Sequence, residues 1–259
     1  MSTADLANRE EQYRLFYQLQ ASQPKRTYAQ HCEDLATIEI LGRPPRNFID
    51  IGAADGVTCS NTLLWALQGA QGLSFEPIPT QYQLLQALYT YNPSITCINE
   101  GVSDSRKTAN IQSDGLLSFV LDTEDKGLTG ALSPFMNPGA EILTVSFKPL
   151  AYWLNQYPEF RHTDVVSLDV EGHELSVLHG IDFQSFRSGI FIVETHSEVA
   201  DGTAWLHRDY AEIDSYFKKH GYIATLKNPI NTFWIYKDLL DRASIERVKV
   251  LLPDYAILG

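Results

Sequence analysis

Two acidic residues, each near the end of a short apolar segment, are the first candidates for a binding site. The sequence NFIDIGAADG at 47–56 predicts a strand that carries Asp50 and ends in a turn of small residues around Gly52. The sequence LSFEP at 73–77 predicts a second strand that ends in Glu76. Glycine and alanine let a ligand approach the backbone closely. A carboxylate at the end of the next parallel strand can accept hydrogen bonds from both ribose hydroxyls. Together the two segments predict a pocket for an adenosine-containing cofactor.

The charges around this turn indicate which kind of cofactor it suits. A dinucleotide site typically has the spacing Gly-x-Gly-x-x-Gly, with a helix N-terminus facing the pyrophosphate. Here the spacing is Asp50-x-Gly52-x-Ala54-x-Gly56, and Asp55 lies inside the turn. Two carboxylates would repel a pyrophosphate but would attract a cation. The pattern therefore favours S-adenosylmethionine, which carries a sulfonium and an ammonium group, and it is typical of the first motif of Rossmann-like methyltransferases.

A second acidic group follows two later predicted strands. One strand is followed by Asp169, Glu171 and His173, and the other by Glu194 and His196. Several like charges in one cleft require a cation, a shared proton or a raised carboxyl pKa. For methyl transfer to a hydroxyl, His196 or His173 could act as the base and Asp169 could orient the substrate. Alternatively, Asp169, Glu194 and His196 could hold Mg²⁺ or Mn²⁺. The sequence leaves these alternatives open.

The segments that must position these residues alternate between strand and helix patterns. This alternation predicts a Rossmann-like, doubly wound α/β fold with a mostly parallel, seven-stranded sheet and one reversed strand. Loops after the strands should then meet at the carboxyl edge of the sheet. A hairpin is expected over 107–122 and a loop over the pocket at 122–138. The expected strands are 47–51, 73–75, 94–99, 142–147, 165–168, 190–193, 222–226 and 232–236, and the expected helices are 5–20, 32–41, 60–68, one that begins at Thr80, 150–156, 173–179 and 210–220.

Domain organisation and composition limit the classes of function. We expect an N-terminal helical extension at 1–45, a Rossmann-like domain at 46–240 and a C-terminal helix and tail at 241–259. The apolar stripe of the first helix could cover the domain or meet a second subunit, so a homodimer is an open alternative. The formal net charge of −12 argues against a nucleic-acid-binding surface. The three cysteines are widely spaced, and neither a signal peptide nor an apolar run long enough for a membrane span is expected, so we predict a cytoplasmic protein.

Several motifs in order resemble the FkbM-type S-adenosylmethionine-dependent methyltransferases. They are QHCED at 30–34, FIDIGAADG at 48–56 with SNT at 60–62, FEP at 75–77, NEGVSD at 99–104 and SLDVEGHE at 167–174, and the resemblance runs from about residue 28 to 237. It implies O-methylation, commonly of sugar hydroxyls in glycans or natural products. It also implies that Asp169 and Glu171 face the methyl group and the acceptor. The expected cofactor-binding residues are Asp34, Asp50, Gly52, Ala53, Asp55, Asn61, Glu76, Pro77, Ser103 and Asp104, with Glu76 at the ribose and Ser103 or Asp104 near the adenine.

Two other functions compete with sugar O-methylation. A methyltransferase for a lipid or polyketide hydroxyl would be favoured by an acceptor pocket lined with apolar side chains. A non-catalytic binding module could retain the fold as a scaffold, but such a module has no need of a carboxylate for ribose.

Overall fold

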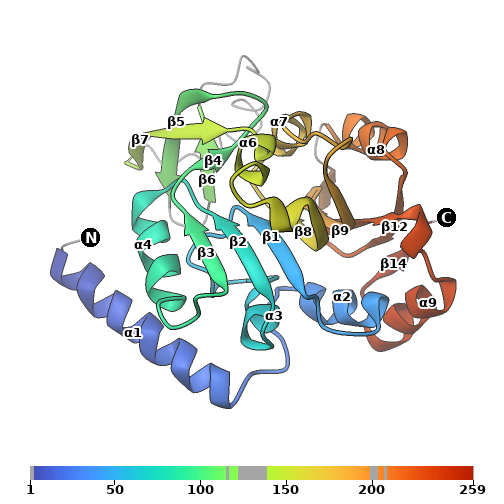
Figure 1. Cartoon of the computed structure of the whole chain (residues 1–259), viewed down its shortest axis with the longest axis horizontal. Helices are drawn as coiled ribbons and strands as arrows, with labels where there is room; N and C mark the ends of the chain where they lie inside the picture. The colour runs from blue at the N-terminus through green and yellow to red at the C-terminus, as the bar shows by residue number, and fades with distance from the viewer. Residues whose placement is uncertain (1–2, 115–116, 122–138, 199–203, 207–208, 259) are drawn as a thin grey trace.

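One twisted sheet with helices on both faces forms the body of the protein in the computed structural model (Figure 1). The structure describes residues 3–114, 117–121, 139–198, 204–206 and 209–258. Over these residues the main sheet has eight strands, in the order β14-β12-β13-β9-β8-β1-β2-β3. Their bounds are β1 Asn47–Ile51, β2 Gln71–Phe75, β3 Ile95–Ile98, β8 His162–Leu168, β9 Arg187–Glu194, β12 Tyr222–Lys227, β13 Asn231–Tyr236 and β14 Ala256–Ile257.

The strand directions make this a Rossmann-like, doubly wound sheet, as the sequence predicts. Strands β1, β2, β3, β8 and β9 are parallel, whereas β13 is antiparallel to β9 and β12 is antiparallel to β13. The chain builds β1, β2 and β3 outward and then returns to place β8 on the other side of β1. The prediction of seven strands with one reversed is wrong at the edge, because β14 pairs antiparallel with β12. A strand of two residues is too short to show an alternating pattern.

Alternate residues of the central strands pack into two cores on opposite faces of the sheet. Phe48 of β1 packs on one face, and Ile49 and Ile51 pack on the other. The helices on the first face are α1 Thr3–Ser22, α2 Glu33–Leu41, α3 Leu63–Leu67, α4 Pro79–Leu88 and α9 Arg242–Leu251, and those on the second are α6 Leu150–Leu154, α7 Glu174–His179 and α8 Tyr210–Lys219. Two 3₁₀ turns, η1 Pro158–Arg161 and η2 Lys237–Leu239, complete the described helices.

The first helix packs along α4 through one side and leaves apolar residues on the other. Tyr17 is buried against Tyr89, whose ring centroid lies 5.8 Å away. Leu15 and Leu19, one helical turn apart, are exposed. At the other end of the first face, α2 packs against α9. The expected extension and tail thus contribute to the same core as the central domain, and the boundaries between them stay a prediction.

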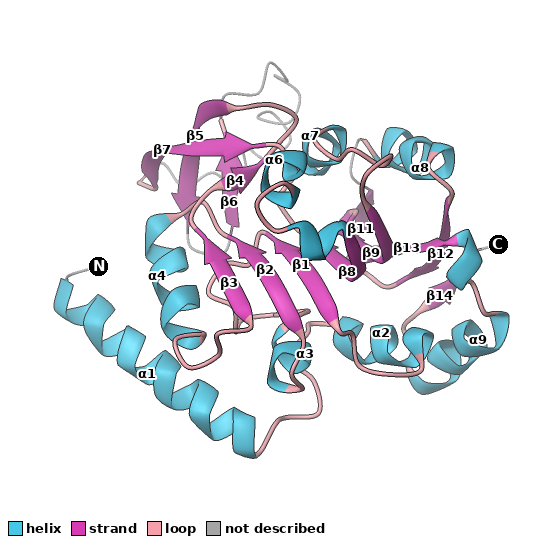
Figure 2. Ribbon diagram, in the orientation of Figure 1, coloured by secondary structure: helices cyan, strands magenta, loops and turns pink. Residues whose placement is uncertain are grey.

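A second, four-stranded sheet lies above the carboxyl ends of β1, β2 and β3 (Figure 2). Its strand order is β4-β7-β5-β6, and its core consists of residues such as Ile111, Val145 and Phe147. Strands β5 and β6 form the predicted hairpin, while the predicted loop at 122–138 lies outside the described residues. The bounds are β4 Gly101–Val102, β5 Lys107–Asp114, β6 Leu117–Val120 and β7 Glu141–Lys148. A further pair, β10 His196–Glu198 and β11 Ala204–Leu206, is antiparallel.

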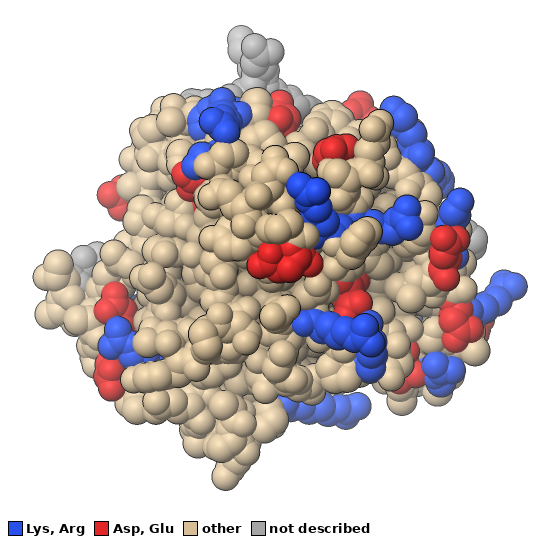
Figure 3. Space-filling model, in the orientation of Figure 1, with Lys and Arg blue, Asp and Glu red and all other residues tan. Residues whose placement is uncertain are grey.

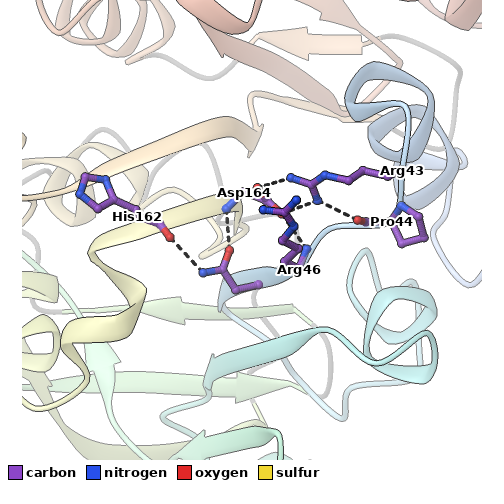
Figure 4. A network of polar contacts seen from close by, with 6 residues as sticks. Arg43, Pro44, Arg46, His162 and Asp164 are labelled. Carbon is purple, nitrogen blue, oxygen red and sulfur yellow. Dashed lines mark hydrogen bonds and ion pairs between the residues drawn. The ribbon is translucent and has the colours of Figure 1, made fainter.

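A polar network fixes the amino ends of β1 and β8, opposite the carboxyl edge (Figure 4). The Asp164 carboxylate accepts hydrogen bonds from Nη1 and Nη2 of Arg43 at 2.7 and 2.9 Å and from the backbone nitrogen of Arg46 at 2.6 Å. The Asn47 side chain donates to the carbonyl oxygen of His162 at 2.9 Å and accepts from the backbone nitrogen of Asp164 at 2.8 Å. These contacts hold the two central strands in register.

Charged residues of both signs are mixed on one face of the molecule (Figure 3). On the face seen in Figure 3, Lys and Arg side chains lie in separate groups among acidic and neutral ones. Among the described residues, no helix has the length and apolar character needed to cross a lipid bilayer.

Candidate functional site

The largest group of sequence-predicted site residues lines one cavity at the carboxyl edge of the main sheet. The cavity has a volume of about 430 Å³, which lies within the usual range for small-molecule and cofactor sites. It lies where the loop after β1 and the loop after β8 leave the sheet in different directions, because β1 leads to β2 on one side and β8 leads to β9 on the other. Ligands of doubly wound folds bind at such a switch point.

Gly52 allows the loops after β1 and β8 to approach each other. Its φ is +90°, and a Cβ atom at this position would lie 1.7 Å from the carbonyl oxygen of Asp169. The backbone nitrogens of Gly52 and Ala53 both donate to the carbonyl oxygen of Phe75 at 3.0 Å. The sequence indicates that the glycine makes room for a ligand. In the structure, the missing side chain of Gly52 also makes room for the backbone of Asp169, just after the end of β8.

Glu76 is held at the end of β2 with both carboxylate oxygens hydrogen-bonded to the backbone. Oε2 accepts from the nitrogen of Ala54 at 2.9 Å, and Oε1 accepts from the nitrogen of Ile78 at 2.7 Å. The side chain lines the cavity, and burial raises the pKa of its carboxyl to about 7. An ionised carboxylate has about four acceptor positions, so these two bonds leave acceptor capacity for a ligand.

Asp50 is a second buried acid on the cavity wall, within β1 itself. Its Oδ2 accepts a hydrogen bond from Oγ1 of Thr62 at 2.7 Å. Burial, and to a smaller extent the charge of Asp169, raises the pKa of its carboxyl to about 7. A positive charge brought into the cavity would favour the ionised form of both Asp50 and Glu76.

Two other expected cofactor residues, Asp34 and Asp55, have their carboxylates occupied elsewhere and lie outside the cavity lining. Asp34 accepts from Oγ1 of Thr27 and from the backbone nitrogens of Tyr28 and Leu35, at 2.6 to 2.9 Å. Asp55 accepts from the backbone of its own turn and from the Tyr13 hydroxyl at 2.6 Å. Both acids thus brace the chain around the pocket, which differs from the sequence-based expectation.

Ser103 and Asp104 also lie outside the lining, behind His173. The Ser103 hydroxyl lies 2.9 Å from Nε2 of His173 and 3.0 Å from Oδ1 of Asp104. His173 lines the cavity and packs against the Phe147 ring. Burial lowers the pKa of His173 to about 4, so its imidazole is neutral at pH 7 and is a weak base. Ser103 therefore reaches the cavity lining through His173, and the expected place of Ser103 or Asp104 near the adenine stays a prediction.

Asp169, Glu171 and Glu194 come together as the sequence indicates. One carboxylate oxygen from each lies within 4.8 Å of the others, and all three residues line the cavity. Burial, followed by the charges of Asp169 and Glu174, raises the pKa of Glu171 to about 9. Burial and the same neighbouring acids raise the pKa of Glu194 well above its usual value. A proton shared within this group, or a bound cation, would relieve the repulsion.

The turn that carries Glu171 has an unusual backbone. Glu171 has a φ of +55°, which is strained for a residue with a side chain, and Gly172 follows with a φ of +93°. Oε1 of Glu174 accepts from the backbone nitrogens of Val170 and Gly172 at 3.1 and 3.2 Å. Glu174 therefore shapes the turn, and the turn directs Glu171 toward the other two acids.

The remaining predicted residues are placed as follows. Ala53, Asn61 and Pro77 line the cavity. The backbone of His196 lies in β10, opposite Leu206, and its side chain is outside what the structure describes. The described group of acids with suitable spacing for a metal ion consists of Asp169, Glu171 and Glu194.

Sequence reasoning missed several lining residues. Gln30 lies within a motif that carried the family resemblance but was given no role, and Ile230 lies in the predicted turn before the last strand. The sequence indicates the hairpin, the strand at 142–147 and the NEGVSD motif at 99–104, but not that they form one wall of the cavity, because the position of the second sheet depends on long-range pairing. The missed residues of this wall are Gly101, Val102, Ile111, Ser118, Val120 and Phe147.

Comparison with known proteins gives one family match. The model of the family described as "Methyltransferase FkbM domain" matches residues 50–224. No curated protein matches the chain.

Among solved structures, the likenesses are distant. An O-methyltransferase from Bacillus cereus in complex with SAH is 11% identical, with 88% of this chain and 90% of that chain covered and a TM-score of 0.43. A magnesium protoporphyrin IX methyltransferase from Synechocystis with bound SAM is 13% identical, with coverages of 78% and 76% and a TM-score of 0.41. A precorrin-6y C5,15-methyltransferase from Geobacter metallireducens is 10% identical, with coverages of 82% and 93% and a TM-score of 0.40.

Proposed function

Because the chain belongs to the FkbM methyltransferase family, we propose that it transfers a methyl group from S-adenosylmethionine to a hydroxyl oxygen of a sugar, in a glycan or a glycosylated metabolite. The observation that carries this proposal is the placing of acids at both ends of one cavity. Glu76 follows β2 at one end, and at the other end Asp169 follows β8 and Glu194 is the last residue of β9. Asp50 of β1 lies between them.

The residues at the first end fit the cofactor. Glu76 keeps acceptor capacity for ribose hydroxyls, and beside it Ile78, Val102 and Phe147 offer an apolar surface for a planar base. Asp50 supplies negative charge for the cationic part of the cofactor. We include Gly52, Ala53, Asn61 and Pro77 in this binding set. When bound, S-adenosylmethionine supplies an electrophilic methyl group on a sulfonium sulfur.

The acids at the second end suit a polyhydroxylated acceptor. Carboxylates accept hydrogen bonds from hydroxyl groups and so can orient one hydroxyl oxygen for in-line attack. Formation of the carbon–oxygen bond would break the carbon–sulfur bond of the donor and leave S-adenosylhomocysteine, while the hydroxyl proton passes to a carboxylate. The exposed Asp169 is the proposed acceptor of that proton. A proton shared within the group of Asp169, Glu171 and Glu194 would hold the three acids together. Carboxylates at this end favour a sugar over the apolar hydroxyl compounds of the alternative proposal.

A divalent cation is the alternative to the shared proton. Hard carboxylate oxygens are ligands that Mg²⁺ and Mn²⁺ prefer, and the spacing of Asp169, Glu171 and Glu194 is compatible with one ion. The sequence also predicts His196 as a ligand of this ion, and we keep that role as a proposal. Treatment with EDTA followed by metal titration separates the alternatives. Full activity in EDTA supports the shared proton, and activity restored by Mg²⁺ or Mn²⁺ assigns the ion.

Labelled S-adenosylmethionine tests the reaction directly. We expect the wild-type protein to transfer label to one or more members of a panel of sugars and methyl glycosides. Label transferred only to a hydroxylated lipid or polyketide would support the runner-up reaction. Absence of S-adenosylmethionine binding in calorimetry would contradict both. A binding scaffold would keep its partner in the Asp50→Ala and Glu76→Ala variants, whereas an enzyme would lose cofactor affinity.

The Asp169→Asn variant tests the assignment of the proton acceptor. The amide has a similar size but accepts no proton, so we expect kcat to fall by about 10²- to 10⁴-fold. Cofactor affinity measured by calorimetry should change little. Unchanged turnover would remove Asp169 from the chemistry.

Three proposals concern the setting of the reaction. We propose a cytoplasmic protein, since Cys32, Cys59 and Cys97 are free. We propose that nucleic acid is not its substrate, since the net charge is −12. A homodimer through the exposed side of α1 stays an alternative to a monomer, which sedimentation would decide.

A further inference from the structure

Glu33, at the start of α2, is a fully buried acid that joins two distant segments of the chain. Its Oε1 accepts hydrogen bonds from Nδ2 of Asn228 at 2.7 Å and from Nδ2 of Asn231 at 2.8 Å. Its Oε2 accepts from the backbone nitrogen of His31 at 2.9 Å. Its exposed fraction is 0%. Three donors from two segments therefore converge on one carboxylate that the proposed chemistry does not use.

The Asn228 side chain, which donates to Glu33, also accepts hydrogen bonds within the turn between β12 and β13. Its Oδ1 accepts from the backbone nitrogens of Ile230 at 3.0 Å and Asn231 at 2.7 Å. The carbonyl oxygen of Ile230 accepts from the nitrogen of Thr195, the residue after Glu194, at 2.9 Å. The conformation of residues 228–231 is thus fixed on one side by Glu33 and on the other by the end of β9.

Each of the two joined segments contributes one residue to the cavity wall. Gln30 precedes His31 and is exposed, and Ile230 lies within the Asn228–Asn231 turn and is half-buried. The turn lies next to Glu194, on the side of the sheet away from Glu76, since β13 follows β9 in the strand order. Gln30 and Ile230 therefore line the end of the cavity that we assign to the acceptor.

We propose that Glu33 is a positioning residue that holds Gln30 and Ile230 together as a wall for the acceptor, with the Gln30 amide binding an acceptor hydroxyl. This inference rests on the proposed function for the identity of the acceptor. The chemistry requires an acid at Glu33, because all three partners are N–H donors and a carboxylate is an acceptor only. A glutamine would direct an N–H₂ group toward one of these donors. The wall would then loosen while the cofactor end keeps its own contacts.

Hydrogen–deuterium exchange and calorimetry on the full chain test, without an acceptor, whether Glu33 holds residues 30–31 and the 228–231 turn in place. In Glu33→Gln we expect the amide hydrogens of His31, Ile230 and Asn231 to exchange at least tenfold faster. Amides around Gly52 and Glu76 should be unchanged, and the affinity for S-adenosylhomocysteine should stay within twofold of wild type. The matched control is Glu39→Gln, an acid on the same helix that pairs with Arg247 at the surface, which should leave all these amides unchanged.

Activity on a panel of methyl glycosides, with labelled S-adenosylmethionine, tests the wall. For a methylated panel sugar we expect Glu33→Gln and Gln30→Ala to raise its KM at least fivefold, with a smaller change in kcat. If Glu33→Gln fails to fold, Asn231→Ala removes one bond to the carboxylate and should show the same pattern more weakly. Uniformly faster exchange across the domain, unchanged exchange at Ile230, or an unchanged KM would overturn the proposal. If the wild-type protein binds no cofactor, or methylates no sugar of the panel, the proposed function is contradicted instead. Hydrogen exchange in Glu33→Gln would still test whether Glu33 holds the two segments.

Discussion

At the residue scale, the carboxyls of Asp50 and Glu76 change charge near neutral pH. Burial raises the pKa of each to about 7, and a bound cofactor favours the ionised form. We therefore expect cofactor affinity to rise from pH 6 to pH 8, by about tenfold for each carboxyl that must ionise. S-adenosylhomocysteine lacks the sulfonium and keeps only the ammonium as a positive charge, so ionisation of Asp50 should affect its affinity less. S-adenosylmethionine reports on both acids and should show the steeper dependence in calorimetry.

The same raised pKa values make the empty protein less stable as the pH rises. Because the folded pKa of Glu76 lies above its unfolded value of about 4.5, the native state binds the proton more tightly between about pH 4.5 and 7. Its contribution is full below that window and is lost as the pH rises through it. The loss is about 3 kcal/mol at most. Glu76→Gln should flatten this part of the pH profile of chemical unfolding, and an equally steep profile would contradict the assignment.

Gly52 and Gly69 form a matched pair of glycines with nearly the same backbone. Their φ values are +90° and +92°, but a Cβ at Gly69 would meet nothing within 4 Å, whereas one at Gly52 would meet the Asp169 carbonyl oxygen. We expect Gly69→Ala to lower the free energy of unfolding by about 1 kcal/mol, from backbone strain alone. Gly52→Ala should lower it by more than about 2 kcal/mol and abolish cofactor binding. Equal effects would show that the contact is unimportant.

The acids also show what the sequence can and cannot predict at this scale. Asp50 and Glu76 line the cavity, whereas Asp34 and Asp55 hold backbone and hydroxyl donors of their own surroundings. All four lie within or close to the end of a strand or helix, in the motifs that carry the family resemblance. A carboxylate binds a ligand or a nearby N–H group equally well, and the sequence does not state which donor folding will bring closest.

At the element scale, α1 braces the cofactor turn from outside the region that the family model matches. The Tyr13 hydroxyl donates to Asp55 at 2.6 Å, and Asp55 in turn accepts from the backbone nitrogen and hydroxyl of Thr58, which lines the cavity. We expect Tyr13→Phe to lower the free energy of unfolding by about 1 kcal/mol and to weaken cofactor binding severalfold.

The control for this prediction is Tyr17→Phe on the same helix. The Tyr17 hydroxyl accepts from Asn92 at 2.6 Å, and neither residue lines the cavity. This change should lower stability similarly, as measured by denaturant unfolding, and leave cofactor affinity unchanged. Equal losses of affinity in both variants would mean that α1 acts only through overall stability.

Local periodicity predicts the type of most elements, including the β5–β6 hairpin and strand β7 of the second sheet, but it does not predict which strands pair across long segments. Strand β1 and helix α4 carry repeated apolar positions, so their type follows from a short window. The parallel pairing of β4 with β7 joins Gly101 to Phe147 across a long segment, and the ring of Phe147 covers the space a Cβ of Gly101 would occupy. Such pairing depends on tertiary contacts that no local pattern encodes, which is why the cavity wall from the second sheet was not foreseen.

At the scale of the whole molecule, the carboxyl ends of the central strands carry the candidate site, whereas their amino ends carry contacts that stabilise the fold. The carboxyl ends of β1 and β8 carry buried acids and turns with positive φ values, at Gly52 and Glu171, of which only the one at Glu171 is strained. The amino ends carry the Arg43–Asp164 network, where donors and acceptors are matched (Figure 4). Like charges concentrated at one end lower stability, and paired charges at the other end offset part of that loss.

Asp164→Asn tests this separation of stability from chemistry. Burial opposes ionisation of Asp164, but the hydrogen bonds from Arg43 and Arg46 outweigh it and lower its pKa. The carboxylate therefore stabilises the fold above its unfolded pKa of about 3.9, and this contribution is lost as the pH falls through the lower folded value. Because Arg43 is partly exposed, we expect a loss of only about 1–2 kcal/mol at pH 7 in denaturant unfolding. Cofactor affinity and kcat should stay within twofold of wild type. A large loss of either in a folded variant would show that register at the amino ends controls the acids at the carboxyl ends.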